Sequence, residues 1–197
     1  MTQTPGDIVS RLCDTEGLLD IAPTGAATQS STSRWSHPDD AQRAVQDLSV
    51  TDFAFHTADE ADAWWALDFA APGPISYIIV ENRRKQQFQD KAHNLRVEIG
   101  TPGIPGVEIY AANAPFGASP EGTPLVVPVT GDQQVSRIKI TRVGPGYFHL
   151  SKVSILAPKP VLAEDADIGQ KTAVGKTGAK ASRKGSTKAA GKKSRRR

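Results

Sequence analysis

The chain has 197 residues, enough for one domain with a hydrophobic core plus appendages, and its hydrophobic share of 38% is low enough to suggest that part of it does not fold. No apolar run approaches the length of a membrane span, and the first residues lack the basic and apolar regions of a secretion signal, so we expect a cytoplasmic location. The single cysteine, Cys13, excludes an intrachain disulfide and a CxxC metal or redox motif.

The formal net charge of +3 conceals an uneven distribution of charge along the chain. The segment from Lys171 to Arg197 holds 11 of the 24 lysines and arginines and no acidic residue. The first 170 residues hold the other 13 basic residues and all 21 acidic ones, which gives them a net charge of −8. The sequence therefore predicts an acidic folded part with a basic tail.

The first third of the chain predicts little regular structure. Apolar residues between Ile8 and Cys13 predict a short helix that Gly17 ends. Residues 22–36 are rich in Ser, Thr, Ala and Gly, which is typical of an extended entry strand with turns. Residues 38–45 begin with a proline and two aspartates and predict one capped helical turn.

From Trp64 onward, apolar residues alternate with a period of two, as they do in β-strands. Turns rich in glycine and proline separate the segments. The expected strands lie near residues 64–69, 75–81, 95–99, 107–109, 125–129, 135–141 and 148–155. Short strands between such turns predict an all-β sandwich, because a parallel α/β sheet would need long amphipathic helices between its strands and none is visible.

The strand pattern stops after Ile155. Residues 157–170 predict a linker with an acidic patch, and residues 171–197 offer almost no apolar area to offset the entropy of ordering, so we expect a disordered tail. The predicted organisation is an N-terminal extension (1–21), a β-sandwich (22–156), the linker (157–170) and the tail (171–197).

Several short motifs, in this order along the chain, resemble the discoidin family, the factor V/VIII type C or galactose-binding-like domains. They are Phe55-His56-Thr57, Trp64-Trp65-Ala66-Leu67-Asp68, Asn82-Arg83, Asn94-Leu95-Arg96-Val97 and Tyr147-Phe148-His149-Leu150. The likeness is strongest to fucose-binding F-type lectins and to bacterial discoidin-type modules associated with polysaccharide systems. It covers about residues 22–156 and implies a jelly-roll β-sandwich.

The sugar motif of the F-type lectins is a histidine, 26 further residues, an arginine, and then another arginine or lysine. His56 and Arg83 have this spacing, and Lys91 is the third basic residue if the loop contains one inserted residue, since a strict count ends on Asp90. The resemblance therefore implies a ligand-binding set of His56, Arg83 and Lys91, in which the imidazole and the guanidinium donate hydrogen bonds to sugar oxygens. Trp64 alternates to the opposite face from Trp65 and completes the expected set.

The loop around these residues departs from the lectin pattern. The acid expected two residues after the arginine is Lys85 here, so the resemblance does not support fucose, and a hydroxyl-rich or anionic glycan is equally expected. The lectins also hold a structural calcium. Its ligand positions fall on Arg43, Gln46, Leu48 and Lys152. Two of these positions are basic. The sequence therefore predicts either that no metal or cofactor is bound, or that an ion pair takes the place of calcium and joins Arg43 or Lys152 to Asp47 or Asp52.

Other interpretations of these residues remain open. His56 could bond to Glu60 or to the backbone instead of a ligand, and Arg83 could form a surface ion pair with Glu81 or Asp90. Trp35 is either a packing residue or a sugar platform. Trp65 is expected in the core, and His149 is expected to be structural.

The sequence offers no sign of an enzyme. It has no Gly-x-Ser-x-Gly elbow and no P-loop, and its histidines lack metal-ligand spacing. It therefore predicts a non-catalytic, lectin-like module that binds a glycan or polysaccharide. The alternative is a protein-interaction or scaffold module without sugar binding. The tail predicts contact with a polyanion, either nucleic acid or an acidic polysaccharide, unless it only solubilises the chain or folds back on the acidic part.

Overall fold

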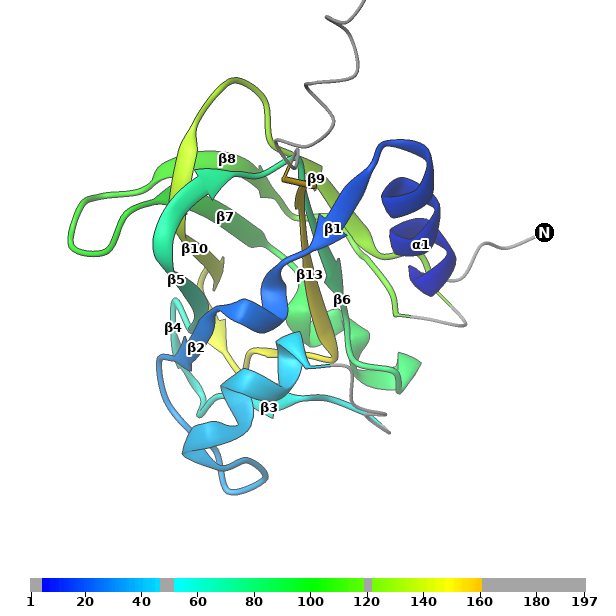
Figure 1. Ribbon diagram of the computed structural model, residues 1–197. Helices are drawn as coiled ribbons and strands as arrows, with labels where there is room; N and C mark the ends of the chain where they lie inside the picture. Colours follow the sequence, from blue (N-terminus) through cyan, green and yellow to red (C-terminus); the bar gives the residue numbers. More distant parts are fainter. Residues whose placement is uncertain (1–4, 47–51, 119–121, 161–197) are drawn as a thin grey trace, which may run out of the picture. The chain divides into compact units, whose positions relative to one another are not determined.

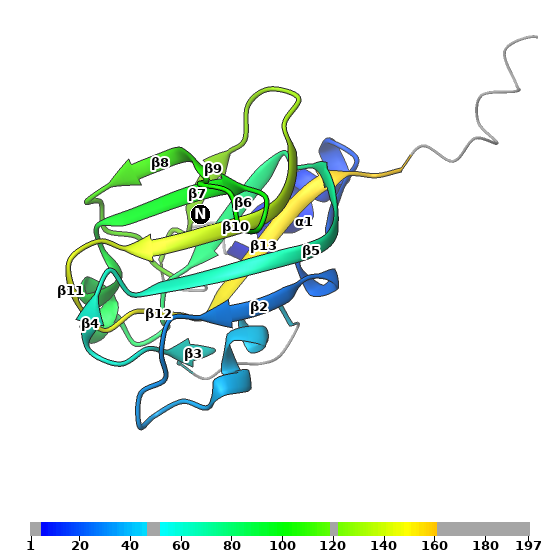
Figure 2. The ribbon, with the colours of Figure 1, turned by 90° about the vertical axis from the view of Figure 1, so that its left-hand side faces the viewer.

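The computed structural model describes residues 5–46, 52–118 and 122–160 of the chain. They form two main antiparallel sheets with a shared core, which confirms the predicted β-sandwich. The four-stranded sheet has the order β1 (Leu18–Asp20), β13 (Lys152–Pro158), β6 (Tyr77–Glu81) and β9 (Leu125–Pro128). The five-stranded sheet has the order β2 (Ala26–Gln29), β5 (Trp64–Pro74), β10 (Gln134–Arg142), β7 (Leu95–Gly100) and β8 (Val107–Ala112), which can be followed in Figure 2.

The core lies between the two sheets and follows the alternation of the strands. In β7 every second residue is buried, and the register places Val97 opposite Ile140 and Ile99 opposite Ile138 of β10. Trp65 is also completely buried, as the sequence predicted, and its Nε1 donates to the carbonyl of Ala41 at 3.0 Å. Because side chains alternate across a strand, the neighbouring polar residues face away from this core.

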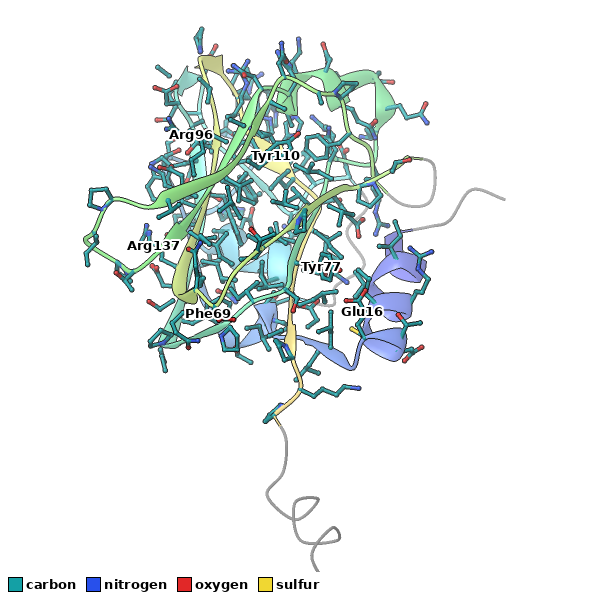
Figure 3. All side chains as sticks on the ribbon, turned by 90° about the horizontal axis from the view of Figure 1, so that it is seen from above. Glu16, Phe69, Tyr77, Arg96, Tyr110 and Arg137 are labelled. Carbon is teal, nitrogen blue, oxygen red and sulfur yellow. The ribbon has the colours of Figure 1, made fainter. Side chains whose placement is uncertain are left out.

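Helix α1 (Pro5–Thr15) covers the outer face of the four-stranded sheet (Figure 1). Its residues Ile8, Val9 and Leu12 pack with the buried Ile79 and Leu156. The hydroxyl of Tyr77 lies 3.4 Å from a carboxylate oxygen of Glu16, just beyond the helix (Figure 3). The predicted short helix is therefore confirmed, and Gly17 follows it with φ +64°, a conformation that glycine adopts without strain.

Three 3₁₀ turns connect the strands: η1 (Ala22–Thr24), η2 (Pro38–Val45) and η3 (Gln86–Ala92). The η2 turn confirms the capped turn expected from the sequence. The carboxylate of Asp40 caps it by accepting hydrogen bonds from the backbone N–H of His37 and the hydroxyl of Ser36, both at 2.9 Å.

Two short strand pairs close one end of the sandwich. They are β3 (Phe55–His56) with β12 (His149–Leu150), and β4 (Glu60–Ala61) with β11 (Pro145–Gly146). The strand series expected at residues 148–155 is thus divided at Ser151, because its hydroxyl turns inward and donates to the carbonyl of Asn82 at 2.6 Å. Because of this division, β12 pairs with a different strand than β13 does.

The predicted domain boundaries remain predictions. Strand β1, which falls within the expected extension 1–21, pairs with β13. The tail and most of the linker lie outside the described residues. In the part of the chain that the structure describes, no helix is long and apolar enough to cross a membrane.

Candidate functional site

A pocket of about 490 Å³ lies beside the β3–β12 strand pair. Its residues come from the β2–η2 loop, from β3 and the residues before it, from the segment between β6 and β7, and from β12 and Tyr147, which lies two residues before it. The basic and imidazole side chains that line it are His56, Arg83, Lys85, Lys91 and His149; the others are Asp52, Trp35, Phe53, Phe88 and Tyr147. Three of the four predicted ligand-binding residues, His56, Arg83 and Lys91, therefore line one pocket.

Backbone hydrogen bonds hold His56 and the adjacent loop in place. His56 pairs with His149 across the β3–β12 ladder. Its carbonyl accepts a hydrogen bond from the N–H of Ser33 at 3.1 Å, and its own N–H donates to the hydroxyl of Ser36 at 3.2 Å. These bonds tie the loop that carries Trp35 to β3, and they place the Trp35 ring 5.2 Å from the His56 ring.

The ring of His56 presents an acceptor nitrogen rather than the expected donor. Its Nδ1 lies 2.9 Å from the carbonyl oxygen of Thr57, and because a carbonyl can only accept, Nδ1 carries the proton. Burial lowers the pKa of His56, and the nearby Arg83 lowers it further, so the ring is neutral near pH 7. In a neutral ring Nε2 is then the acceptor. The alternative prediction, that His56 bonds to the backbone instead of to a ligand, is thus observed for Nδ1.

Aromatic rings surround His56 on several sides. Phe53 and Tyr147 each lie 5.2 Å from it, in T-shaped and tilted arrangements, and Tyr147 is also 5.9 Å from Trp35. Trp35 remains 50% exposed, and the guanidinium of Arg34 lies 4.4 Å from its ring centroid. The pocket therefore has an aromatic wall that is partly open to solvent.

Arg83 is buried and fixed by Asp52. Its Nε donates to Asp52 Oδ1 at 3.0 Å, and its Nη2 donates to Asp52 Oδ2. Its Cζ lies 4.9 Å from the ring centroid of Phe53 and 4.5 Å from that of Phe88. Neither Glu81 nor Asp90, the partners weighed from the sequence, makes this ion pair. Within the described ranges, the hydrogen bonds of this guanidinium come from Nε and Nη2.

Asn82 anchors the segment that carries the basic residues. Its side chain is completely buried, and its amide donates to the carbonyls of Gln89 and Phe116, both at 2.9 Å. Its Oδ1 accepts from the N–H of Arg83 at 2.8 Å, and Gln89 donates back to the carbonyl of Arg83 at 2.9 Å. Three of these bonds close the turn between Arg83 and η3 and position both Arg83 and Lys91.

Asp52 is the one carboxylate among the described residues that line this pocket. Burial alone would raise the pKa of Asp52, but the hydrogen bonds from the Arg83 side chain and the Lys85 N–H outweigh it and lower the pKa below the ordinary 3.8. The side-chain ammonium of Lys85 lies 3.6 Å from the same carboxylate. Asp52 is therefore an ionised partner of Arg83.

Two of the expected calcium positions carry basic side chains, Arg43 and Lys152, which offer no oxygen ligand to calcium. The guanidinium of Arg43 lies 3.3 Å from the carboxylate of Asp40, while Asp52 pairs with Arg83 and Lys85. Arg43 thus pairs with Asp40 and not with Asp52, the alternative that involves Lys152 stays a prediction, and Asp47 lies outside the described residues. Within the described ranges, no three His, Cys, Asp or Glu side chains come together as a metal site would need.

His149 lies at the buried edge of the pocket. It is completely buried, and its ring centroid lies 5.4 Å from that of His56. Neither ring nitrogen has a hydrogen-bond partner among the described residues. Burial, with the positive charge of Arg83 nearby, lowers the pKa of His149 to about 3, so this ring is also neutral.

Trp64, the fourth predicted ligand-binding residue, is not among the residues that line this pocket. It lies in β5 opposite Thr141 of β10, on the face of the strand that points away from the core. The ammonium of Lys139 lies 5.5 Å from the centroid of its ring. The alternation of β5 thus separates Trp64 from the three basic residues.

Sequence reasoning did not select seven of the lining residues for the site, namely Trp35, Asp52, Phe53, Lys85, Phe88, Tyr147 and His149. Trp35 was left open between packing and a sugar platform, and Tyr147 belonged to a motif that pointed only to the fold. No local pattern marks the pairing of Asp52 with Arg83, because 30 residues separate them in the chain. Their short distance depends on the path of the whole chain.

No family model and no curated protein matches the chain, but solved structures resemble its fold. A fucose-binding module of Streptococcus pneumoniae aligns with a TM-score of 0.56 and 21% identity over 72% of this chain and 99% of its own. A family 32 carbohydrate-binding module of C. perfringens, solved with galactose, aligns with a TM-score of 0.56 and 14% identity over 71% and 99%. The serum F-type lectin of Morone saxatilis, the striped bass, aligns with a TM-score of 0.54 and 18% identity over 72% and 48%.

These structures share the backbone arrangement of the described part of the chain. At such identities the likeness concerns the arrangement of the backbone. It confirms the fold that the sequence motifs implied: the described part of this chain is a discoidin-like, galactose-binding-like β-sandwich.

Proposed function

We propose that this protein is a non-catalytic carbohydrate-binding module that holds a sugar in the pocket beside β3 and β12. His56, Arg83 and Lys91 are its polar contacts. The observation that supports this most directly is that these three residues line the same pocket as a half-exposed tryptophan. Sugar sites need both polar groups that fix orientation and an apolar surface.

Each group has a distinct role in this proposal. Nε2 of His56 accepts a hydrogen bond from a hydroxyl group, and Nη1 of Arg83 donates to another oxygen. The guanidinium keeps its orientation because Asp52 and the two phenylalanine rings hold it before the sugar arrives. Trp35 and Tyr147 offer aromatic faces to the C–H groups of the sugar ring.

The similar structures support the ligand class without fixing the sugar. They include a fucose-binding module, a module solved in complex with galactose and a chitosan-binding module, so this backbone serves several sugars. The pocket also supports a binding role rather than hydrolysis. A glycosidase needs two carboxyl groups beside the bond it cleaves, and the described lining has only Asp52, which is already paired.

A glycan array, followed by calorimetric titration of the bound glycans, tests this proposal on the full chain. We expect binding that Trp35→Ala and Arg83→Ala each weaken at least tenfold. Trp35→Ala is the more informative variant because it removes a half-exposed ring, whereas Arg83→Ala leaves Asp52 buried without its partner. Ile104→Ala is the matched control, since it removes an exposed apolar side chain from the β7–β8 turn, outside this pocket.

Two results would contradict the proposal. One is that no glycan binds to the folded protein, which would favour the protein-interaction or scaffold alternative. The other is that glycans bind but neither pocket variant changes their affinity, which would move the site elsewhere.

A further inference from the structure

The charges around the pocket are predominantly positive. Among the described residues, Arg83, Lys85 and Lys91 line it together with one carboxylate, that of Asp52. Both lining histidines are neutral near pH 7, because burial lowers their pKa values. The lining therefore carries a net charge of +2, and it remains +1 when Asp90, the partner of Lys91, is included.

The positive charges differ in how firmly they are already paired. Arg83 and Asp52 form a buried ion pair and neutralise each other. Lys85 and Lys91 lie at the solvent-exposed side, with side chains 61% and 57% exposed. Their ammonium groups are 3.6 Å and 3.5 Å from Asp52 and Asp90, distances too long for strong charge-assisted hydrogen bonds. Exposed pairs of this kind are weak, so both lysines can turn to an anionic ligand.

The two lysines belong to the same loop as the sugar-contacting arginine. Both follow Arg83 within the segment that Asn82 anchors, and both line the pocket from that segment. In the same pocket, Trp35, Tyr147 and the neutral His56 form an aromatic wall. A ligand that satisfies both groups of residues needs a sugar ring for the wall and a negative group for the lysines.

We propose that the ligand is an acidic sugar, a unit whose carboxylate or sulfate group is bound by Lys85 and Lys91 while its ring lies against Trp35 and Tyr147. This inference rests on the proposed function and specifies its ligand class. A lysine ammonium is a mobile point charge and accepts either anion, so the experiment has to distinguish the two.

Calorimetric titration of the full chain with small matched pairs tests the inference. Galacturonic acid and its methyl ester differ in the charge of the carboxyl group and by one methyl group, and galactose 6-sulfate and galactose differ only in the sulfate. We expect the charged member of at least one pair to bind at least tenfold more tightly. The pair with the larger preference identifies the anion.

Variants show whether the pocket causes this preference. Lys85→Met and Lys91→Met keep most of the aliphatic stem and remove the charge, and each should reduce the preference several-fold. Arg84→Met removes a neighbouring exposed charge that does not line the pocket, and should leave the preference unchanged. The basic tail is identical in all these chains, so its attraction for anions cancels in the comparison.

The outcomes separate this inference from the proposed function. Equal or tighter binding of the uncharged members, still weakened by Trp35→Ala, would overturn the acidic ligand and leave the sugar site standing. A preference for the charged members that survives both lysine variants would also overturn it. If the folded chain binds none of the four sugars and no glycan on the array, both proposals fail.

Discussion

At the scale of single residues, His149 illustrates how burial ties stability to pH. In the unfolded chain its pKa is near 6.5, and in the folded protein it is about 3. Between these values the unfolded chain takes up a proton that the folded protein does not, so stability falls as the pH falls below 6.5. The lowered pKa of His56 acts in the same direction. Above pH 6.5 neither histidine changes the free energy of unfolding.

His149→Phe should therefore make the protein less sensitive to mild acid. Phenylalanine fills a similar volume and removes two ring nitrogens that have no described partner. We expect the wild-type free energy of unfolding to drop by about 3 kcal/mol more than that of the variant between pH 6.5 and 4, from about 1.4 kcal/mol per pH unit. Urea unfolding at several pH values measures it. If the free energy of unfolding fell with pH by the same amount in both proteins, this role of His149 would be contradicted.

Two arginine–aspartate pairs among the described residues, Arg83 with Asp52 and Arg137 with Asp68, provide a second comparison between single residues. Asp52→Ala leaves the buried Arg83 without its partner, and we expect a loss of about 3–5 kcal/mol in the free energy of unfolding. Asp68→Ala removes the partner of Arg137, which is more exposed, and should cost about 0–1 kcal/mol. Chemical denaturation of both variants compares them. Equal losses would mean that burial does not decide the strength of these pairs.

At the scale of elements, the sequence indicated more about which elements form than about what they contact. The apolar residues between Ile8 and Cys13 predicted a helix because their spacing matches a helical face. The same spacing could not show that this face covers the outer side of the four-stranded sheet, since any apolar surface would satisfy it. Likewise β6 alternates as expected, but both of its faces are covered, one by the core and one by α1.

The packing of α1 leads to a prediction for Leu12. Leu12→Ala removes apolar contact with the sheet and should lower the free energy of unfolding by about 1–2 kcal/mol, because the side chain is partly buried. Ser10→Ala, on an exposed position of the same helix, should change it by less than about 0.5 kcal/mol. Urea denaturation measures both. If the two variants are equally stable, α1 contributes little to the folded unit.

At the scale of the whole molecule, the sequence divides the chain by charge. The tail from Lys171 to Arg197 lies outside the described residues, and its contact with a polyanion stays a prediction from its composition. Binding of such a tail to DNA would come mainly from the release of counterions, so its affinity should fall steeply with salt. This behaviour does not depend on the pocket.

Replacing all 11 tail lysines and arginines with glutamine should abolish most DNA binding at low salt and flatten its dependence on salt. Fluorescence anisotropy with a labelled duplex, titrated at several salt concentrations, measures both effects. The Trp35→Ala variant serves as the control, because it alters the pocket and leaves the tail charges intact. Unchanged affinity after the replacement would exclude the tail as the source of DNA binding.

The sequence by itself determined the β-sandwich, because alternation, turn residues and the capped turn are local signals that the chain carries along its length. The resemblance to a lectin motif also implied that His56, Arg83 and, with one inserted residue, Lys91 lie together, and these three side chains line one pocket. Only the tertiary structure decided the surroundings of these residues. It paired Arg83 with Asp52, brought Trp35 and Tyr147 beside His56, and set Trp64 on another face. Such contacts join segments far apart in the chain, and their distances follow from how the strands are ordered and paired.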